Sequence, residues 1–156
     1  MQKALFISST GGHLSELLKL SPLFKYYDYR IITEKTSNNL KLKERYGNKI
    51  SFLVYGTKLN KLSYVFKFLA NCFISLYYFI KFKPKYIITT GTHTAVPMCF
   101  IGKLFRKKIV FIETFANTSS KTVSGKVVYK IADLFIVQHK SMLKLYPKAK
   151  YFGGVF

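Results

Sequence analysis

The chain has 156 residues, the length of one ordinary domain, and its content of 49% hydrophobic and 17% aromatic residues excludes an intrinsically disordered protein. Its formal net charge of +20, from 26 Lys and Arg against 6 acids, favours a polyanionic partner: nucleic acid, an anionic membrane surface or a phosphorylated substrate. A general compositional bias explains the charge equally well, because lysine recurs in nearly every segment.

Short apolar runs alternate with helix-like segments along the chain. The runs with the pattern of β-strands cover residues 3–9, 29–33, 50–55, 86–90, 108–113, 134–138 and 150–152. The helix-like segments between them cover residues 13–23, 38–46, 59–82, 94–105, 124–132 and 140–145. Continuous apolar strands of this length are typical of a parallel sheet that is covered on both faces. We therefore predict an α/β fold, a doubly wound, Rossmann-like parallel sheet with helices on both faces, as one domain over residues 1–156.

The predicted sheet has one edge at which a ligand is expected. In doubly wound sheets, ligands bind beyond the carboxyl ends of the strands, where helix N-termini offer unpaired N–H groups. Four segments meet at this edge, one after each of the first, second, fourth and fifth strands: residues 10–13, Glu34, residues 91–94 and residues 113–117.

Gly11 and Gly12 form the turn at this edge that points most clearly to a ligand. Glycine allows positive φ and a close approach to the backbone, and the following helix presents its N–H groups to an anion. The spacing matches neither the dinucleotide fingerprint nor the P-loop. The stretch favours a phosphate-binding turn, with a plain strand-to-helix turn as the alternative.

Two side chains at this edge are candidate catalytic groups. His13 can act as a general base or donate a hydrogen bond to a phosphate, because imidazole titrates near neutral pH. Glu113 ends an apolar strand and could orient a substrate hydroxyl, but a structural role in holding the following loop is equally consistent. His93 lies in another loop of the same edge. The spacing of Cys, His and acidic residues indicates no metal site, and we expect no cofactor.

The cysteines and the N-terminus indicate a cytoplasmic protein. Cys72 and Cys99 lie in apolar runs without the spacing of a disulfide framework or a zinc site, so buried free thiols in a reducing compartment are expected. The apolar run over residues 4–8 is too short for a signal peptide.

Residues 59–82 form the longest helix-like segment. A narrow polar stripe follows it at helical spacing, made of Asn60, Ser63, Lys67, Asn71 and Ser75. The length would suffice to span a bilayer, but the polar stripe and the position between two strands of one sheet argue against spanning. We predict an interfacial helix that contacts the membrane through Phe66, Phe73, Tyr77, Tyr78, Phe79, Lys81 and Lys83. A buried crossover helix is an equal alternative.

Basic clusters at residues 81–85 and 105–108 raise nucleic acid as another polyanionic partner. The sequence contains no helix-turn-helix, zinc-finger or RNA-recognition signature, and its aromatic residues lie within apolar runs instead of alternating with basic residues. We therefore expect no nucleic-acid partner.

Four stretches together resemble the Alg14-like family of polysaccharide-biosynthesis proteins, which includes PssD-like bacterial capsule and exopolysaccharide subunits. They are SSTGGHLSELLKL, YIITTGTHTAVPMCFIGKL, KKIVFIETFANTSSKTVSGKVVYKIADLFIVQ and YPKAKYFGGVF. The motifs GGH and TTGTHTAVP are more distantly similar to the N-terminal domain of the MurG-type glycosyltransferases, which have a GT-B fold. The resemblance covers nearly the whole chain.

The resemblance implies one lobe of a split, membrane-associated glycosyltransferase. This chain would bind a polyprenyl-diphosphate-linked sugar acceptor, and it would recruit or activate a separate Alg13/PssE-like catalytic chain that binds the UDP-sugar. The implied acceptor-diphosphate site consists of Thr10, Gly11, Gly12, His13, Gly91 and His93. His13 and Glu113 remain the candidate catalytic residues, and the partner is a third possible source of the base.

The implied reaction is inverting hexose transfer in capsular or exopolysaccharide synthesis, on the inner face of the plasma membrane. Two alternatives stay open. In the first, the chain is a noncatalytic membrane adaptor that stabilises the transferase. In the second, it is a stand-alone nucleotide-binding protein.

Overall fold

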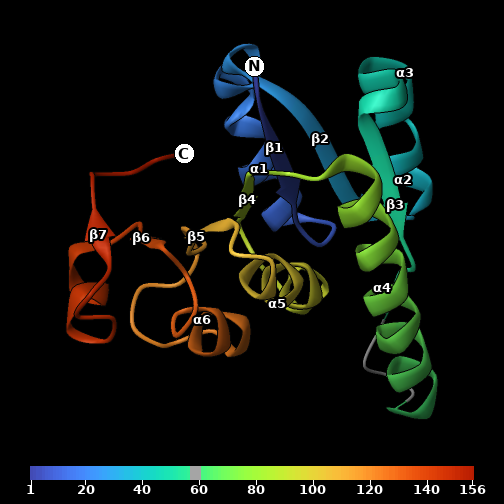
Figure 1. Cartoon of the computed structure of the whole chain (residues 1–156). Helices are drawn as coiled ribbons and strands as arrows, with labels where there is room; N and C mark the ends of the chain where they lie inside the picture. Colours follow the sequence, from blue (N-terminus) through green and yellow to red (C-terminus); the bar gives the residue numbers. More distant parts are fainter. Residues whose placement is uncertain (57–60) are drawn as a thin grey trace.

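The computed structural model describes the backbone of residues 1–56 and 61–156 and the side chains of residues 1–56 and 64–156. Its centre is a 7-stranded parallel sheet in the order β3-β2-β1-β4-β5-β6-β7 (Figure 1). The strands are β1 (Gln2–Ile7), β2 (Tyr27–Glu34), β3 (Ile50–Leu53), β4 (Tyr86–Thr89), β5 (Lys108–Ile112), β6 (Leu134–Val137) and β7 (Lys150–Tyr151). Every predicted strand is present, and the predicted doubly wound α/β fold is confirmed.

The helices differ from the prediction mainly in length and type. The α-helices are α1 (Gly12–Lys19), α2 (Ser37–Leu40), α3 (Leu42–Tyr46), α4 (Lys61–Phe82), α5 (Val96–Leu104) and α6 (Val123–Val128). The 3₁₀ segments are η1 (Ser21–Tyr26), η2 (Gly47–Lys49), η3 (His93–Ala95) and η4 (Lys140–Lys144). The predicted helix over residues 13–23 ends early because Pro22 has no N–H to donate to the carbonyl of Leu18. The predicted helix over residues 38–46 is two short helices, and the one over 140–145 is a 3₁₀ segment.

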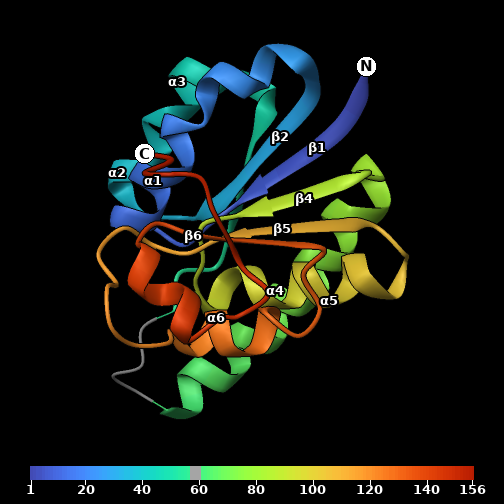
Figure 2. The same cartoon turned by 90° about the vertical axis from the view of Figure 1, so that its left-hand side faces the viewer.

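The helices cover both faces of the sheet. Figure 2 shows α1, α2 and α3 on one side and α4, α5 and α6 on the other. Ala4 and Phe6 of β1 belong to the core beneath α1, whereas Leu5 and Ile7 belong to the core beneath α4 and α5, and all four are fully buried. Burial on both faces explains why this strand is continuously apolar.

Both cysteines are free thiols, as predicted. Cys99 is buried in the core beneath α4 and α5, and this burial raises the pKa of its thiol to about 12. Cys72 on α4 is only half-buried, so the prediction of a buried thiol is wrong for this residue, because it lies at the side of the helix between core and solvent; its partial burial still raises its pKa. A thiol with a raised pKa holds less of the reactive thiolate at neutral pH, which fits packing roles for both.

The long helix α4 presents its polar stripe to the protein. Asn71 is buried, donates from Nδ2 to the Val54 carbonyl at 2.9 Å and accepts the Val54 N–H at 2.8 Å. Ser75, one turn further along, is also buried. The two hydrogen bonds of Asn71 anchor the helix to the chain that leaves β3. Asn60 and the side chain of Ser63, which were predicted in the same stripe, lie outside the described residues.

The order of the strands changes direction at the centre of the sheet. β1 to β3 extend the sheet toward one edge, and β4 to β7 extend it toward the other. The loops that follow the neighbouring strands β1 and β4 therefore diverge, and doubly wound folds bind ligands in the crevice at this point. These two loops carry Gly11 and Gly91.

Candidate functional site

The turn after β1 leaves the start of α1 open. Gly11 has φ +78°, a conformation that favours glycine, and no described atom lies within 4 Å of a Cβ built at Gly11 or Gly12. No side chain of the described residues caps α1, so the N–H groups of its first turn are available to an anion. The turn thus has the geometry that was predicted for phosphate binding.

His13 is held in a defined orientation by the end of β4. Its Nδ1 lies 2.8 Å from the Thr90 carbonyl oxygen, and the Thr90 hydroxyl donates to the His13 carbonyl at 2.7 Å. Because a carbonyl oxygen only accepts, Nδ1 carries the hydrogen, and Nε2 of the neutral ring keeps a free lone pair. The side chain is 24% exposed. His13 therefore has the tautomer that a general base at Nε2 requires.

Gly91 packs against the ring of His13. Its φ is +99°, and a Cβ at this position would lie 3.5 Å from both Cε1 and Nδ1 of the imidazole. The same Cβ would lie 3.7 Å from the hydroxyl oxygen of Ser124 at the start of α6. Glycine is thus required here for backbone conformation, and the loops after β1, β4 and β5 meet around it.

Glu34 connects the loops after β1 and β4. This carboxylate is buried at the end of β2, where Oε2 accepts the Thr10 N–H at 3.0 Å and Oε1 accepts the Thr94 hydroxyl at 2.8 Å. His93 Nε2 lies 4.0 Å from Oε1, so this second histidine approaches the same carboxylate from the β4 loop. An acid at the end of an apolar strand is visible in the sequence, but its partners follow only from the fold.

Substituting Glu34→Ala should loosen both loops. The Thr10 N–H and the Thr94 hydroxyl would lose their acceptor, at a cost of roughly 1–3 kcal/mol for each group that stays buried and unpaired. We expect a lower melting temperature and faster amide hydrogen exchange at Thr10. Glu44→Ala, which removes an exposed acid from α3, is the matched control and should change neither. Unaltered exchange at Thr10 in the Glu34 variant would contradict this role.

Glu113 is buried and fully engaged, with 1% of its surface exposed. It accepts the Thr122 hydroxyl at 3.0 Å, the Tyr146 hydroxyl at 3.1 Å and the Thr114 N–H at 3.2 Å. A Cβ at Gly125 would come within 2.6 Å of its Oε2, so α6 packs directly on the carboxylate. Burial raises the pKa of Glu113, although its hydrogen bonds and the nearby His13 oppose this shift. The geometry favours the structural alternative for Glu113 over a catalytic role.

Glu113 should make folding stability depend on pH. Its raised pKa means that the folded state binds this proton more tightly than the unfolded chain, so stability should fall as pH rises through the folded pKa. Glu113→Gln removes the titrating group and should flatten this part of the profile, whereas Glu113→Ala leaves two hydroxyls unpaired and should cost about 2–5 kcal/mol. Urea unfolding from about pH 4 to about pH 8 measures both effects. An equally steep profile in the Gln variant would contradict the assignment.

Glu16 on α1 is a site residue that sequence reasoning missed. Its Oε1 accepts the Thr114 hydroxyl at 2.7 Å and the Phe115 N–H at 2.9 Å, which ties α1 to the loop after β5. Its Oε2 is buried, lies 3.7 Å from His13 Nδ1 and has no hydrogen-bond partner among the described residues. The sequence contains one indication of this role. Glu16 lies three residues after His13, which places both side chains on one side of the helix.

Exposed apolar side chains are concentrated on the face of the molecule formed by α4, α5 and α6. Of the 19 large hydrophobic side chains exposed in the described part of the chain, eleven lie on these helices or directly after α5. They are Val65, Phe66, Leu69, Phe73, Tyr77, Ile80, Phe100, Leu104, Phe105, Val123 and Val127. Exposed apolar side chains gathered on one face of a protein usually mark a contact with a membrane or another protein. We call this set the apolar face.

The predicted membrane contacts on α4 need one correction. Phe66, Phe73 and Tyr77 are exposed, as are Lys81 and Lys83 at the end of the helix. Phe79 is 4% exposed and packs in the core, and Tyr78 is half-buried against the same core. The reason is the helical period: residues 71, 75, 79 and 82 face the sheet, whereas 66, 69, 73, 77 and 80 face outward. By length and mean hydropathy of 1.4, the segment Tyr64–Phe82 would also suffice to cross a membrane.

Solved structures define the class to which this fold belongs. The crystal structure of MurG from Acinetobacter baumannii matches with a TM-score of 0.77 at 16% identity, over 99% of this chain and 46% of that chain. UDP-GlcNAc 2-epimerase from Methanocaldococcus jannaschii matches with a TM-score of 0.73 at 12% identity, over 97% of this chain and 45% of that chain. The chain thus has the fold of one lobe of the GT-B type and spans less than half of each of these structures.

Sequence comparison identifies the family. The family model described as "Oligosaccharide biosynthesis protein Alg14 like" matches residues 57–155, and the chain belongs to this family. The UDP-N-acetylglucosamine transferase subunit ALG14 of Rattus norvegicus is 26% identical over 97% of this chain and 82% of its own length. The subunit of the same name from Kluyveromyces lactis is 36% identical over 45% of this chain and 32% of its own length.

Proposed function

We propose that this protein is the non-autonomous subunit of a two-chain glycosyltransferase that uses a UDP-sugar. The observation that carries the proposal is the open helix start at Gly11 and Gly12 beside the fixed ring of His13. Family membership supports it, because the relatives are named as subunits of a UDP-N-acetylglucosamine transferase. The finer assignment is hexose transfer onto a lipid-linked acceptor in capsular or exopolysaccharide synthesis.

The acceptor diphosphate is proposed to bind along the rim formed by the loops after β1 and β4. The N–H groups at the start of α1 would donate hydrogen bonds to one phosphate, and the partial positive charge of a helix N-terminus would favour its binding. Gly91 packs on the His13 ring, and Thr10 and His93 approach the two oxygens of Glu34, so these residues are proposed to complete the site. The net charge of +20 would assist the approach of a diphosphate.

His13 is proposed as the general base of the transfer. The acceptor hydroxyl would give its proton to Nε2 while its oxygen attacks the anomeric carbon of the sugar, and the bond to the UDP oxygen would break as UDP leaves. One displacement of this kind inverts the configuration at that carbon. Glu113 is proposed to hold the loop after β5, and a separate Alg13/PssE-like partner would supply the UDP-sugar site.

Membrane association is proposed to occur through the apolar face, with Lys81 and Lys83 at its margin. An in-plane helix binds a membrane by burying apolar side chains at the acyl boundary while nearby lysines attract anionic head groups. The protein would then be peripheral on the cytoplasmic side of the plasma membrane. This placement brings the rim to an acceptor that is itself anchored in the bilayer.

Reconstitution of the two chains tests the proposal. The partner is sought in the neighbouring reading frame as a chain with a nucleotide-sugar-binding α/β pattern, and each chain is assayed alone and together with a UDP-sugar and a polyprenyl-diphosphate-linked acceptor. We expect transfer only when both chains are present. Full turnover by either chain alone would overturn the proposal.

A noncatalytic membrane adaptor is the second candidate, and the burial of Glu113 favours it by removing one of the two candidate catalytic groups of this chain. It differs from the first proposal in the role of His13. An adaptor would keep the transferase fully active when His13 is replaced, provided that the complex still assembles on membranes.

A further inference from the structure

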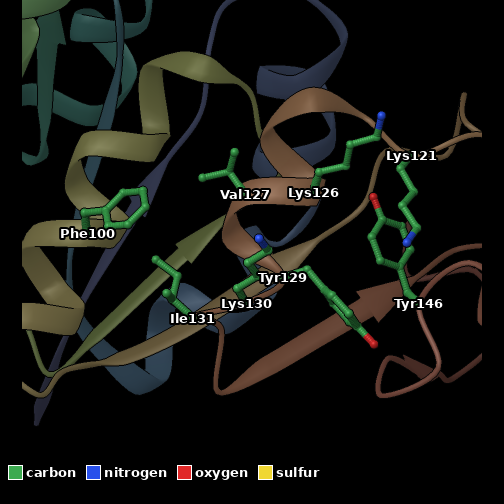
Figure 3. Close-up of a pocket in the computed structure, with 8 residues that line it drawn as sticks. All are labelled: Phe100, Lys121, Lys126, Val127, Tyr129, Lys130, Ile131 and Tyr146. Carbon is green, nitrogen blue, oxygen red and sulfur yellow. The ribbon is translucent and has the colours of Figure 1, made fainter.

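A cavity of about 610 Å³ lies along α6 and the residues that follow it, with Phe100 of α5 at one side. It is lined by Phe100, Lys121, Lys126, Val127, Tyr129, Lys130, Ile131 and Tyr146 (Figure 3). None of these residues belongs to the proposed acceptor-diphosphate site. The cavity is therefore a feature that the proposed transfer reaction does not explain.

The lining combines apolar side chains with lysines. Figure 3 shows Phe100, Val127 and Ile131 together on the side of α5, with Lys121 and Tyr146 on the opposite side. The lining contains three lysines and no acid, and the Nζ of Lys121 lies 5.3 Å from the ring centre of Tyr146. Within the described ranges, none of the three lysines forms an ion pair with an acid. Such a lining is complementary to an anion that carries an apolar chain.

The cavity is continuous with the apolar face. Phe100 and Val127 belong to both, and they are 48% and 37% exposed. Leu104 of α5, which is 79% exposed, extends the apolar face beyond the cavity, and Val123 does so on α6 at 73%. If this face lies on a bilayer, the cavity opens at the level of the lipid head groups, where its three lysines would meet lipid phosphates.

We infer that this cavity binds the phosphate head group of an anionic membrane phospholipid, with the first carbons of its acyl chains over Phe100, Val127 and Ile131. The inference rests on the membrane association in the proposed function but not on the transfer reaction. A free soluble phosphate fits less well, because it would leave the apolar part of the lining exposed to water. The bound lipid would fix how the protein lies on the membrane, and so the height of the rim above it.

The absence of tryptophan from the sequence allows a specific test. Phe100→Trp places a single tryptophan in the lining, and its fluorescence is quenched by lipids with brominated acyl chains in contact with it. The protein is added to vesicles of phosphatidylcholine and phosphatidylglycerol in which either lipid is brominated, at equal mole fractions of the brominated lipid. We expect quenching by brominated phosphatidylglycerol to be at least about twice as strong, because lysines near the surface attract anionic lipid.

Two further variants, each combined with Phe100→Trp, make the result specific to the cavity. Lys126→Gln with Lys130→Gln should make quenching by brominated phosphatidylglycerol about equal to quenching by brominated phosphatidylcholine. Lys19→Gln with Lys41→Gln removes the same charge from exposed positions on the other face and should keep the preference. Inorganic phosphate in solution should leave the tryptophan emission unchanged.

Each remaining outcome is decisive. Vesicle binding without a preference for phosphatidylglycerol, or a preference that survives loss of Lys126 and Lys130, would overturn the cavity assignment and leave the membrane proposal intact. If inorganic phosphate abolishes the stronger quenching by brominated phosphatidylglycerol, the cavity is a site for soluble anions, and the lipid assignment is overturned. A complete lack of vesicle binding would overturn both the cavity assignment and the membrane part of the proposed function, but not the transfer reaction.

Discussion

Replacing His13 by Asn should lower turnover of the reconstituted two-chain transferase by about 100- to 10,000-fold, the usual contribution of a general base. The side-chain amide of Asn can still donate to the Thr90 carbonyl, as His13 Nδ1 does at 2.8 Å, but it has no atom at the position of Nε2. The fold and the loop after β4 should therefore persist while the chemistry is lost. Initial rates at saturating acceptor, measured together with the melting temperature, separate the two effects.

Two controls accompany this substitution. Lys19→Ala changes an exposed residue at the far end of α1 and should keep turnover within a factor of about three, because surface substitutions have small effects. Binding of His13→Asn to the partner and to vesicles should equal that of the unchanged protein. A His13→Asn complex with near-normal turnover would remove His13 from the reaction and favour the adaptor.

Replacing Phe66 and Phe73 together by Ser should strongly weaken binding to anionic vesicles. The two rings are 65% and 74% exposed on the outward side of α4, so their removal should not disturb the core. Burying one Phe contributes about 1.5–3 kcal/mol, so losing two should reduce the partition coefficient by on the order of 100-fold or more. Vesicle sedimentation over a range of lipid concentrations measures this coefficient.

The matched control places the same chemical change on the opposite face. Leu23 and Tyr26 of η1 are 40% and 62% exposed, so Leu23→Ser with Tyr26→Ser removes comparable exposed apolar surface. This variant should bind vesicles like the unchanged protein. If it loses as much affinity as the α4 variant, binding does not depend on the apolar face, and the proposed orientation on the membrane is wrong.

The strands and the position of the site follow from local sequence. Runs such as residues 3–9 are apolar on both sides of the strand, and only a sheet covered on both faces accommodates that pattern. Given the parallel sheet, the turn at Gly11 and Gly12 must lie at its carboxyl edge, and the loop of Gly91 must lie beside it at the change of strand direction.

Side-chain roles at that edge depend on contacts that a sequence does not contain. Glu34 and Glu113 carry the same signal, an acid at the end of an apolar strand. Glu34 joins two loops of the rim, whereas Glu113 is enclosed by α6 and by Tyr146, which is distant in sequence. Phe79 on α4 is a different case, because it lies four residues after Ser75 and the helical period places both on the buried side of the helix.

The proposed anion site at the start of α1 is the central claim, and a substitution at Gly12 tests it most directly. No described atom lies within 4 Å of a Cβ at Gly12, so a side chain fits there. Gly12→Asp would place a carboxylate at the N-terminus of the helix, where it occupies the position of a phosphate and repels one. Gly12→Ala is the neutral control.

The deciding measurement is calorimetric titration of the isolated chain with a short polyprenyl-diphosphate-linked sugar and, separately, with UDP-GlcNAc. We expect the diphosphate-linked sugar to bind the unchanged protein and the Gly12→Ala variant, to lose binding in Gly12→Asp, and UDP-GlcNAc to give no heat of binding with any of them. Tight binding of UDP-GlcNAc without binding of the lipid diphosphate would contradict the account and identify a stand-alone nucleotide-binding protein.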